Sequence, residues 1–308
     1  MSTTMTAMQR CPRCGNENRG TNFACTFCGK RLRIESIERL YFFRRIEDDW
    51  VAPYSFFRKI YYLFVNCPRA FWDINHARKK SPGNIIYFVI TLLYGFMGFA
   101  LFSHFRIVFQ GPYQLDPLLQ PIIPPLFGLL AFFIFGLIYH YLLFRILIWL
   151  FSKGANYAVD YSERLESRFG KEKEEVEKYS ESEMSPFSIY KGGVLQQQQA
   201  HKNKMMLCAF APFMLIYAIE IPIILFALPN VEMTPDGFTT LFVTYKVVWA
   251  VLYALEALVI MIWVPSLIAI AIRELSNSST FRLLIPSYAI GIIVGIFYYF
   301  FRPPFIIL

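Results

Sequence analysis

The sequence predicts an all-α membrane protein in which five transmembrane helices follow a small cysteine-rich domain. Three observations favour this fold class: 56% of the 308 residues are hydrophobic, only 17% are charged, and the mean hydropathy is +0.41. Soluble globular chains carry about 25% charged residues and are less apolar. The first ten residues, MSTTMTAMQR, contain no apolar segment of a secretory signal. We therefore expect membrane insertion to depend on the internal spans.

Four cysteines near the start of the chain form two Cys-x-x-Cys pairs, Cys11 with Cys14 and Cys25 with Cys28. A glycine follows each pair and lets the backbone turn back toward the sulfurs. Four thiolates close a tetrahedral shell around Zn²⁺ and leave no position for a catalytic water. The spacing therefore predicts a structural zinc ribbon over residues 1–32. So short a module lacks a sufficient apolar core, and the metal would supply much of its folding free energy.

Two disulfides and a four-thiolate iron centre are the alternatives to zinc, and disulfides require an oxidising compartment. Nucleic-acid binding is a further alternative, because six Arg and Lys residues lie in or beside the two pairs. We do not favour it, since the segment has no exposed run of aromatic residues on which bases could stack. The two remaining cysteines, Cys67 and Cys208, are isolated in apolar surroundings, so we expect them to be buried.

Five segments are long and apolar enough to cross a hydrocarbon core of about 30 Å as helices. They lie at about 84–104, 122–151, 205–228, 241–272 and 281–301. The second and fourth exceed the minimum length, so we expect them to tilt or to run along the inner interface at one end. Gly291 and Gly295 form a G-x-x-x-G motif in the fifth span. The motif is compatible with close packing inside the bundle or between copies of the chain.

The distribution of basic residues predicts the orientation. Of the 30 Lys and Arg residues, 26 lie in residues 1–83, in the 152–204 loop and in the 273–282 turn. The positive-inside rule places these segments in the cytoplasm, with the C-terminus outside or in a lumen. In a prokaryotic cell the membrane would be the cell membrane. A reducing cytoplasm also keeps cysteine thiols available for a metal.

Residues 33–83 are predicted to be a linker that contains an amphipathic helix in the headgroup layer. Aromatic and aliphatic residues recur at helical spacing around two basic residues: Phe56, Phe57, Ile60, Tyr61 and Phe64. Packing of this helix on a partner or on the bundle is the alternative. The basic cluster at 78–80 would attract anionic membrane lipids.

Residues 152–204 form a charged cytoplasmic insertion between the second and third spans. Glu and Lys recur at helical spacing between 160 and 183, and the sequence SESEMSP then breaks the pattern. We interpret the segment as a solvated arm, with a partner-binding surface as the alternative.

Three motifs between residues 54 and 301 resemble those of the Yip-domain family, the five-span Ypt/Rab-interacting membrane proteins. The stretch FVNCPRAFWDI, with Pro68 and Phe71, is similar to the family's segment before the first span. The glycine pair at 192–193, followed by CAFAP with Pro212, is similar to the family's segment before the third span. The stretch IRELSNSSTFRLLIP is similar to the turn between the last two spans.

The resemblance implies an α-helical bundle with a non-enzymatic role in membrane organisation or trafficking. It also implies homo- or hetero-oligomers and a cytoplasmic protein partner, for which a small GTPase is one candidate. Two features depart from the family pattern. A zinc ribbon in front is more typical of prokaryotic members, and the 152–204 loop is enlarged. No GTPase-contact residue is assigned.

Three ionisable residues, His140, Glu220 and Glu256, lie well inside predicted spans. At about 1.5 Å per residue they are roughly 17 to 24 Å from the cytoplasmic ends, so they could meet near the middle. Such a cluster could relay protons or bind a cation, which makes a small proton- or cation-coupled transporter the alternative function. Hydrogen bonding between helices is the simpler interpretation of the same residues.

The sequence contains no nucleophile with its base, no Gly-rich phosphate loop and no open metal shell, so we assign no catalytic residue and expect no enzyme. The prediction is a five-helix transmembrane bundle over 84–301, preceded by a small zinc-ribbon domain. Such a chain would act as a membrane adaptor or scaffold that contacts lipids and a cytoplasmic protein.

Overall fold

The computed structural model describes residues 9–18, 22, 25, 27, 30–46, 53–77, 81–106, 119, 121–169, 201–276 and 279–301. The described chain is mostly helical. Its contacts divide it into two compact units. Unit 1 comprises residues 1–81, 151–206 and 269–287, and unit 2 comprises residues 82–150, 207–268 and 288–308.

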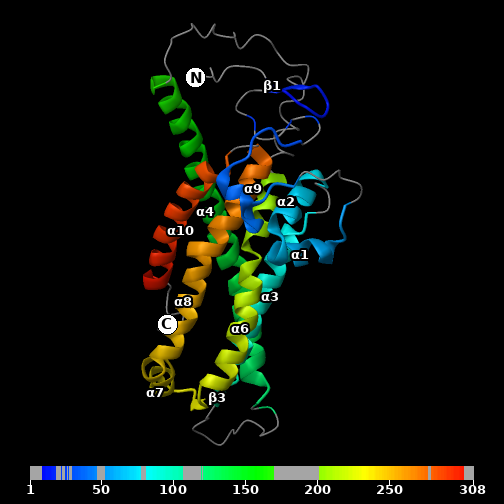
Figure 1. The fold of residues 1–308 in the computed structure, drawn as a ribbon. Helices are drawn as coiled ribbons and strands as arrows, with labels where there is room; N and C mark the ends of the chain where they lie inside the picture. Colours follow the sequence, from blue (N-terminus) through cyan, green and yellow to red (C-terminus); the bar gives the residue numbers. More distant parts are fainter. Residues whose placement is uncertain are drawn as a thin grey trace, which may run out of the picture. The chain divides into compact units, whose positions relative to one another are not determined.

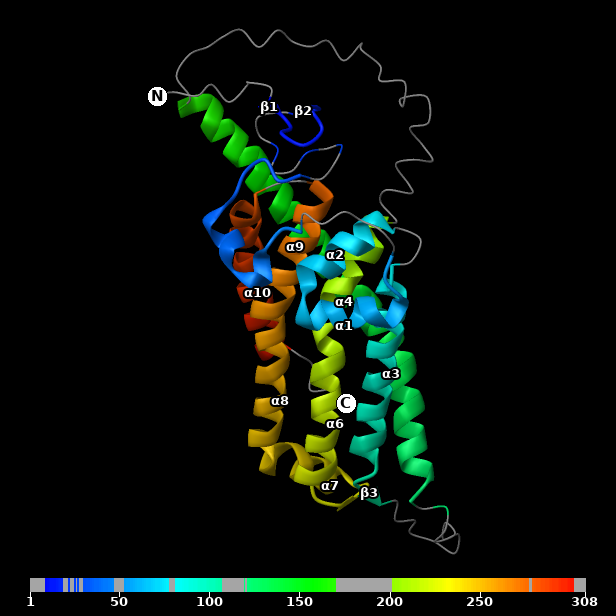
Figure 2. The same cartoon turned by 45° about the vertical axis from the view of Figure 1, so that its right-hand side comes forward.

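In unit 2, the helices α3 (Gly83–Phe102), α6 (Pro212–Ala227) and α8 (Lys246–Leu258) run side by side (Figure 1 and Figure 2). The short strands β3 (Phe105–Arg106) and β4 (Val231–Glu232) follow α3 and α6 and pair in parallel. The α3 and α6 helices therefore run in the same direction. When each long helix crosses a membrane in turn, the first and third spans must run in the same direction, as α3 and α6 do.

Glycines bring α3 against the long helix α4 (Ile123–Phe169). A Cβ atom added to Gly98 would lie 2.6 Å from the Phe132 Cβ atom, and one added to Gly128 would lie 2.7 Å from the Phe102 Cβ atom. Neither distance is attainable for real Cβ atoms. The two helices can approach this closely only because both positions are glycine.

The fourth span is built from several helical pieces. The short helix α7 (Pro235–Thr239) and the π-helix η6 (Thr240–Thr244) precede α8, and the π-helix η7 (Val259–Trp263) joins α8 to α9 (Val264–Ser276). The fifth span is α10 (Thr280–Phe301). A Cβ atom on Gly291 would lie 2.9 Å from the Ile260 carbonyl oxygen, and one on Gly295 would lie 3.2 Å from that of Ala257. The G-x-x-x-G motif therefore packs against the fourth span within unit 2.

Unit 1 contains short elements and helix ends. Its N-terminal part holds the strands β1 (Gln9–Arg10) and β2 (Glu17–Asn18) and the 3₁₀ turns η1 (Ser36–Arg39) and η2 (Tyr41–Phe43). The helices α1 (Phe56–Val65) and α2 (Cys67–His76) pack on each other. The Asn66 side chain caps α2 by accepting a bond from the Arg69 amide at 3.4 Å. Leu63, Phe71 and Ile74 are fully buried between these elements.

Five helices are long and apolar enough to cross a membrane, which confirms the five predicted spans and indicates a multi-pass membrane protein. Their bounds are Gly83–Phe102, Ile123–Ala155, His201–Ala227, Lys246–Leu275 and Thr280–Phe300. The third span includes the 3₁₀ turn η5 (Cys208–Phe210). The apolar side chains that α4 and α10 leave exposed are those that a bilayer would cover: Leu126, Ile134, Ile138, Trp149, Ile293, Phe297 and Phe300 among them.

Several boundaries differ from the predicted ones, among them the start of the third span, which is His201 rather than 205. The α8 helix begins at Lys246 rather than at 241, because Tyr245 leaves helical geometry after η6. The α4 helix continues past 151 to Phe169, because the Glu- and Arg-containing sequence beyond 160 sustains helix formation. The remainder of the predicted arm, residues 170–200, lies outside the described residues, as does the basic cluster at 78–80.

Candidate functional site

The first Cys-x-x-Cys pair lies in a tight turn between β1 and β2, which pair in antiparallel orientation. The Cys11 amide donates to the Asn16 carbonyl at 2.9 Å, and the Gly15 amide donates to the Cys11 carbonyl at 2.9 Å. Gly15 adopts a φ of 71°, a left-handed conformation that a side chain would strain. The turn therefore folds Cys14 back toward Cys11, as the predicted role of the glycine requires.

The sulfurs of Cys11, Cys14 and Cys25 all lie within 4.8 Å of one another. The Sγ atoms of Cys14 and Cys25 are 3.7 Å apart. Two thiolates on a tetrahedral zinc, each at about 2.3 Å from the metal, lie about 3.8 Å apart. The three described sulfurs thus fit three of the four corners of a tetrahedral metal site. Cys28, the fourth predicted ligand, lies outside the described residues.

The surroundings of the three sulfurs favour thiolates over a disulfide. The Arg13 amide lies 3.4 Å from the Cys11 sulfur, and the Asn18 side-chain amide donates to the Cys25 sulfur at 3.4 Å. Such donors stabilise negative charge on sulfur. None of the cysteines that the structure describes is in a disulfide. Cys11 and Cys25 are buried while Cys14 is exposed, so one side of the group faces solvent.

Within the spans, His140 lies in a cluster of aromatic rings on α4. Its Nδ1 atom is 2.9 Å from the Gly136 carbonyl oxygen, and its Nε2 atom is 2.9 Å from the Tyr217 hydroxyl on α6. The rings of Tyr94 and Phe144 lie 5.1 and 5.5 Å from the imidazole, centroid to centroid. His140 thus joins α4 to α6 by a hydrogen bond. This contact agrees with the simpler of the two interpretations, in which the residue serves hydrogen bonding between helices.

Glu220 and Glu256 are also fully buried. The Glu256 carboxylate accepts a hydrogen bond from the Tyr298 hydroxyl at 3.0 Å, which joins the fourth span to the fifth. Among the described residues, Cys11, Cys14 and Cys25 form the group of side chains that lie close enough together to share a metal ion. His140, Glu220 and Glu256 do not form such a group.

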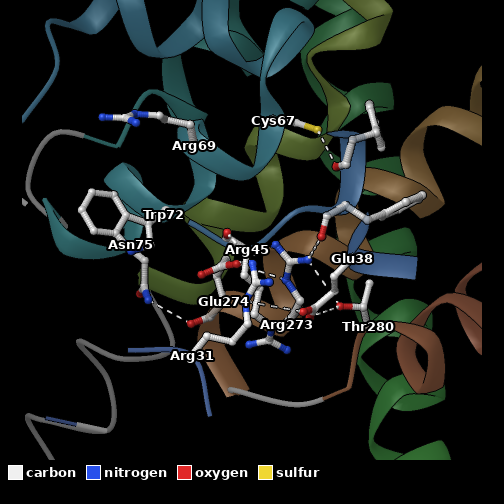
Figure 3. Close-up of polar contacts among 12 residues, drawn as sticks. Arg31, Glu38, Arg45, Cys67, Arg69, Trp72, Asn75, Arg273, Glu274 and Thr280 are labelled. Atoms are coloured by element: carbon white, nitrogen blue, oxygen red, sulfur yellow. Dashed lines mark hydrogen bonds and ion pairs between the residues drawn. The ribbon is translucent and has the colours of Figure 1, made fainter. Parts of the chain in front are cut away.

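Unit 1 contains a polar cluster that the sequence did not predict, and Figure 3 shows it in close-up. The Arg273 side chain is fully buried, donates to the Phe43 carbonyl at 2.6 Å and pairs with Glu274 at 2.8 Å. The Glu38 carboxylate accepts from Arg45 at 2.6 Å and from the Thr280 hydroxyl at 3.2 Å. Residues 38–45, predicted to be linker, are therefore bound to residues 273–280.

A second set of bonds fixes the same two segments. The Glu35 carboxylate accepts from the Thr280 amide at 2.8 Å and from the Ser279 hydroxyl. The Asn75 side chain donates to the Glu274 carbonyl at 2.9 Å, so α2 is joined to the end of α9. The sequence signal for these contacts was weak: the polar stretch IRELSNSST between two apolar spans could mark the segment but not its partners.

The α1 helix forms at the predicted place, but its basic residue Lys59 does not face outward. Lys59 is fully buried and lies 3.0 Å from Asp73 on α2, while Phe57 is 82% exposed and Tyr61 is 60% exposed. The exposed face is therefore aromatic and the buried face carries an ion pair. Periodicity identifies the helix but not which of its faces packs inward.

The two isolated cysteines are buried, as predicted. The Cys67 thiol donates to the Phe42 carbonyl at 3.6 Å, and burial raises the pKa of this thiol to about 12. Comparison of the chain with protein-family models, curated proteins and solved structures finds no significant match.

Proposed function

We propose that this protein is a non-enzymatic membrane adaptor or scaffold of the Yip-domain type. The observation that supports it most is the unit 1 cluster. Glu35, which follows the cysteine module, accepts hydrogen bonds from Ser279 and Thr280. Glu38 accepts a hydrogen bond from the Thr280 hydroxyl, to which Arg273 also donates. An array of buried charged bonds gives a non-spanning part of the chain a defined shape, as a docking surface requires.

In this proposal the cysteine module holds Zn²⁺ through Cys11, Cys14, Cys25 and Cys28. The ion would supply folding free energy to a module that has almost no apolar core. The Cys25 amide donates a hydrogen bond to the Lys30 carbonyl at 2.8 Å. This bond fixes the end of the module, and the contacts of Glu35 and Glu38 follow a few residues later in the chain. The metal-bound module would then present the docking surface for a cytoplasmic protein, with a small GTPase as one candidate.

The proposed topology places the N-terminus in the cytoplasm and the C-terminus outside or in a lumen. The basic residues of the non-spanning segments support it. The exposed aromatic side chains Phe57 and Tyr61 on α1 are suited to contact with membrane lipids or with another copy of the chain.

The adaptor function is tested by comparing the wild-type protein with Cys11→Ala and with Cys208→Ala, a buried cysteine outside the module. Each is purified from native membranes after mild crosslinking, its zinc content is measured, and co-purifying proteins are identified by mass spectrometry. We expect Cys11→Ala to lose both zinc and a specific partner, and Cys208→Ala to keep both. The same partner set in all three samples would refute docking through the module.

A transporter is the second candidate, because three ionisable side chains are fully buried in apolar spans: His140, Glu220 and Glu256. Proton flux into liposomes would decide between the two functions. If the protein is a transporter, Glu256→Gln abolishes flux while the exposed Glu232→Gln leaves it unchanged. An adaptor shows no flux in any of the three proteins.

A further inference from the structure

The outward face of α1 carries a stripe of three apolar side chains. Phe57 is 82% exposed, Tyr61 is 60% exposed and Val65 is 48% exposed. These positions are four residues apart, so their side chains lie on one face of the helix over two turns. The structure narrows the predicted apolar face to this α1 stripe, because Ile60 and Phe64 are only partly exposed. Contiguous exposed apolar side chains of this kind mark a contact with a membrane or with another protein.

Buried contacts on the opposite side fix the rotation of α1 about its own axis. Leu63 is fully buried, and the fully buried Lys59 lies 3.0 Å from Asp73 on α2. The Asp73 carboxylate also accepts from the Tyr54 backbone amide, just before α1, at 3.3 and 3.4 Å. Because these contacts hold one side of the helix inward, they hold the α1 stripe outward. The stripe therefore belongs to the folded surface of unit 1.

The α1–α2 pair is attached to two ends of the membrane spans. The Asn75 side chain on α2 donates to the Glu274 carbonyl at 2.9 Å. Glu274 lies at the end of the fourth span, Lys246–Leu275. In addition, α2 ends at His76 and the first span begins at Gly83, so the chain between them covers no more than about 25 Å even when fully extended. A helix pair attached in this way stays close to the membrane surface.

Arg58 borders the α1 stripe and is itself exposed. Its guanidinium carbon lies 4.6 Å from the centre of the Tyr54 ring and 5.6 Å from that of the Tyr62 ring. One of its nitrogens donates to the Tyr62 hydroxyl at 3.3 Å. Arginine and tyrosine, with an apolar stem and a polar tip, suit the membrane–water interface. A guanidinium group also binds phosphate oxygens, which phospholipid headgroups carry, so the border of the stripe matches the headgroup layer.

A bilayer suits the α1 stripe better than a second copy of the chain does. A Phe or Tyr side chain buries about 150 to 250 Å², so two aromatic residues and one valine offer only a few hundred Å². A stable interface between two proteins takes about 800 Å² from each partner. A helix at the membrane surface, by contrast, needs only a narrow apolar face that enters the boundary between headgroups and acyl chains.

We propose that α1 lies along the membrane–water interface, with its stripe among the lipid acyl chains and Arg58 among the lipid phosphates. The apolar face of such a helix enters the bilayer by about 5 to 10 Å. Through the bond of Asn75 to Glu274, this lipid contact would also fix the depth at which the fourth span ends. The proposal rests on the multi-pass topology alone, so it stands or falls independently of the zinc module and of the adaptor function.

The test uses the full-length protein in vesicles of phosphatidylcholine, with the photoreactive amino acid benzoylphenylalanine in place of one residue at a time. Phe57 and Tyr61 report on the stripe. Phe297, 58% exposed on the fifth span, is the positive control, and Phe27, 79% exposed in the cysteine module, is the matched negative control. All four residues are exposed and aromatic, so the replacement leaves the buried core unchanged. After irradiation, mass spectrometry measures the fraction of the chain that has gained one lipid molecule.

We expect lipid adducts at Phe57 and Tyr61 in yields similar to that at Phe297, and a yield at Phe27 no higher than in a sample kept dark. A product of twice the chain's mass at Phe57, without a lipid adduct, would assign the stripe to a second copy and overturn the proposal. Yields at Phe57 and Tyr61 as low as that at Phe27 would overturn it as well. Equal yields at all four positions would do the same, since labelling would then not depend on the stripe.

Discussion

Replacement of Lys59 by methionine should destabilise unit 1 severely. Lys59 is fully buried, Asp73 is 1% exposed, and their charged atoms are 3.0 Å apart. The methionine variant would remove the Lys59 charge from the buried Asp73 carboxylate, which also accepts from the Tyr54 backbone amide at 3.3 and 3.4 Å. Loss of one partner from a buried pair costs about 3 to 5 kcal/mol. For a unit of this size the melting temperature should fall by roughly 6 to 20 °C.

The assay is thermal unfolding of the purified protein in detergent, followed by intrinsic fluorescence. Arg58→Met is the matched control, because Arg58 is the neighbouring, exposed cation on the same helix. The double variant Lys59→Met/Asp73→Leu should regain most of the loss, since a well-packed apolar pair can replace a buried ion pair. A Lys59→Met protein that melts with wild type and with Arg58→Met would refute the placement of Lys59 inside unit 1.

Three further predictions concern the cysteines and the helix packing. Removal of metal by a chelator should expose the Cys14 thiol to maleimide, and zinc added before the reagent should protect it; equal labelling in both states would contradict a metal site. Cys67 has a folded pKa of about 12, so its neutral thiol stabilises the fold below about pH 8.5 and this contribution is lost as pH rises toward 12. Alkylation of Cys67 in the folded protein should therefore be roughly a thousandfold slower at pH 8.5 than in denaturant, and similar rates would show that it is not buried. Gly98→Ala should cost about 1 to 3 kcal/mol by forcing α3 away from Gly128 on α4, measured as a lower melting temperature, whereas unchanged stability would mean that the helices do not touch there.

The five spans and the Cys-x-x-Cys turn were predictable because both are local properties. A helix that crosses a membrane needs a continuous apolar run, and the glycine after Cys14 fixes a turn within a few residues. The G-x-x-x-G motif in the fifth span also predicted a close contact, but the motif does not identify the partner helix, which only the structure shows. These features require no knowledge of residues far away in the chain.

The unit 1 cluster could not be predicted, because its partners are far apart in the sequence. Arg273 and the Phe43 carbonyl that it contacts are 230 positions apart. Residues 33–46 carry scattered charges that equally suit a solvated linker, and only the fold shows that Glu38 is buried. The burial of Lys59 could not be predicted for a related reason: a cation on an amphipathic helix normally faces water, and a buried Asp73 on the next helix reverses that preference.

The wide separation of the bonded residues sets an order of assembly during synthesis. Glu35 emerges from the ribosome long before Thr280, which follows 245 positions later. Until then Glu38 and Arg45 can pair, but the contacts of Glu35 and Glu38 with Ser279 and Thr280 cannot form. The nascent chain must therefore keep its first folded segment in an unfinished state while four spans are inserted. A chain halted before residue 279 would present these acidic side chains without their hydroxyl and amide donors, and cellular quality control could distinguish it from the finished protein by that difference.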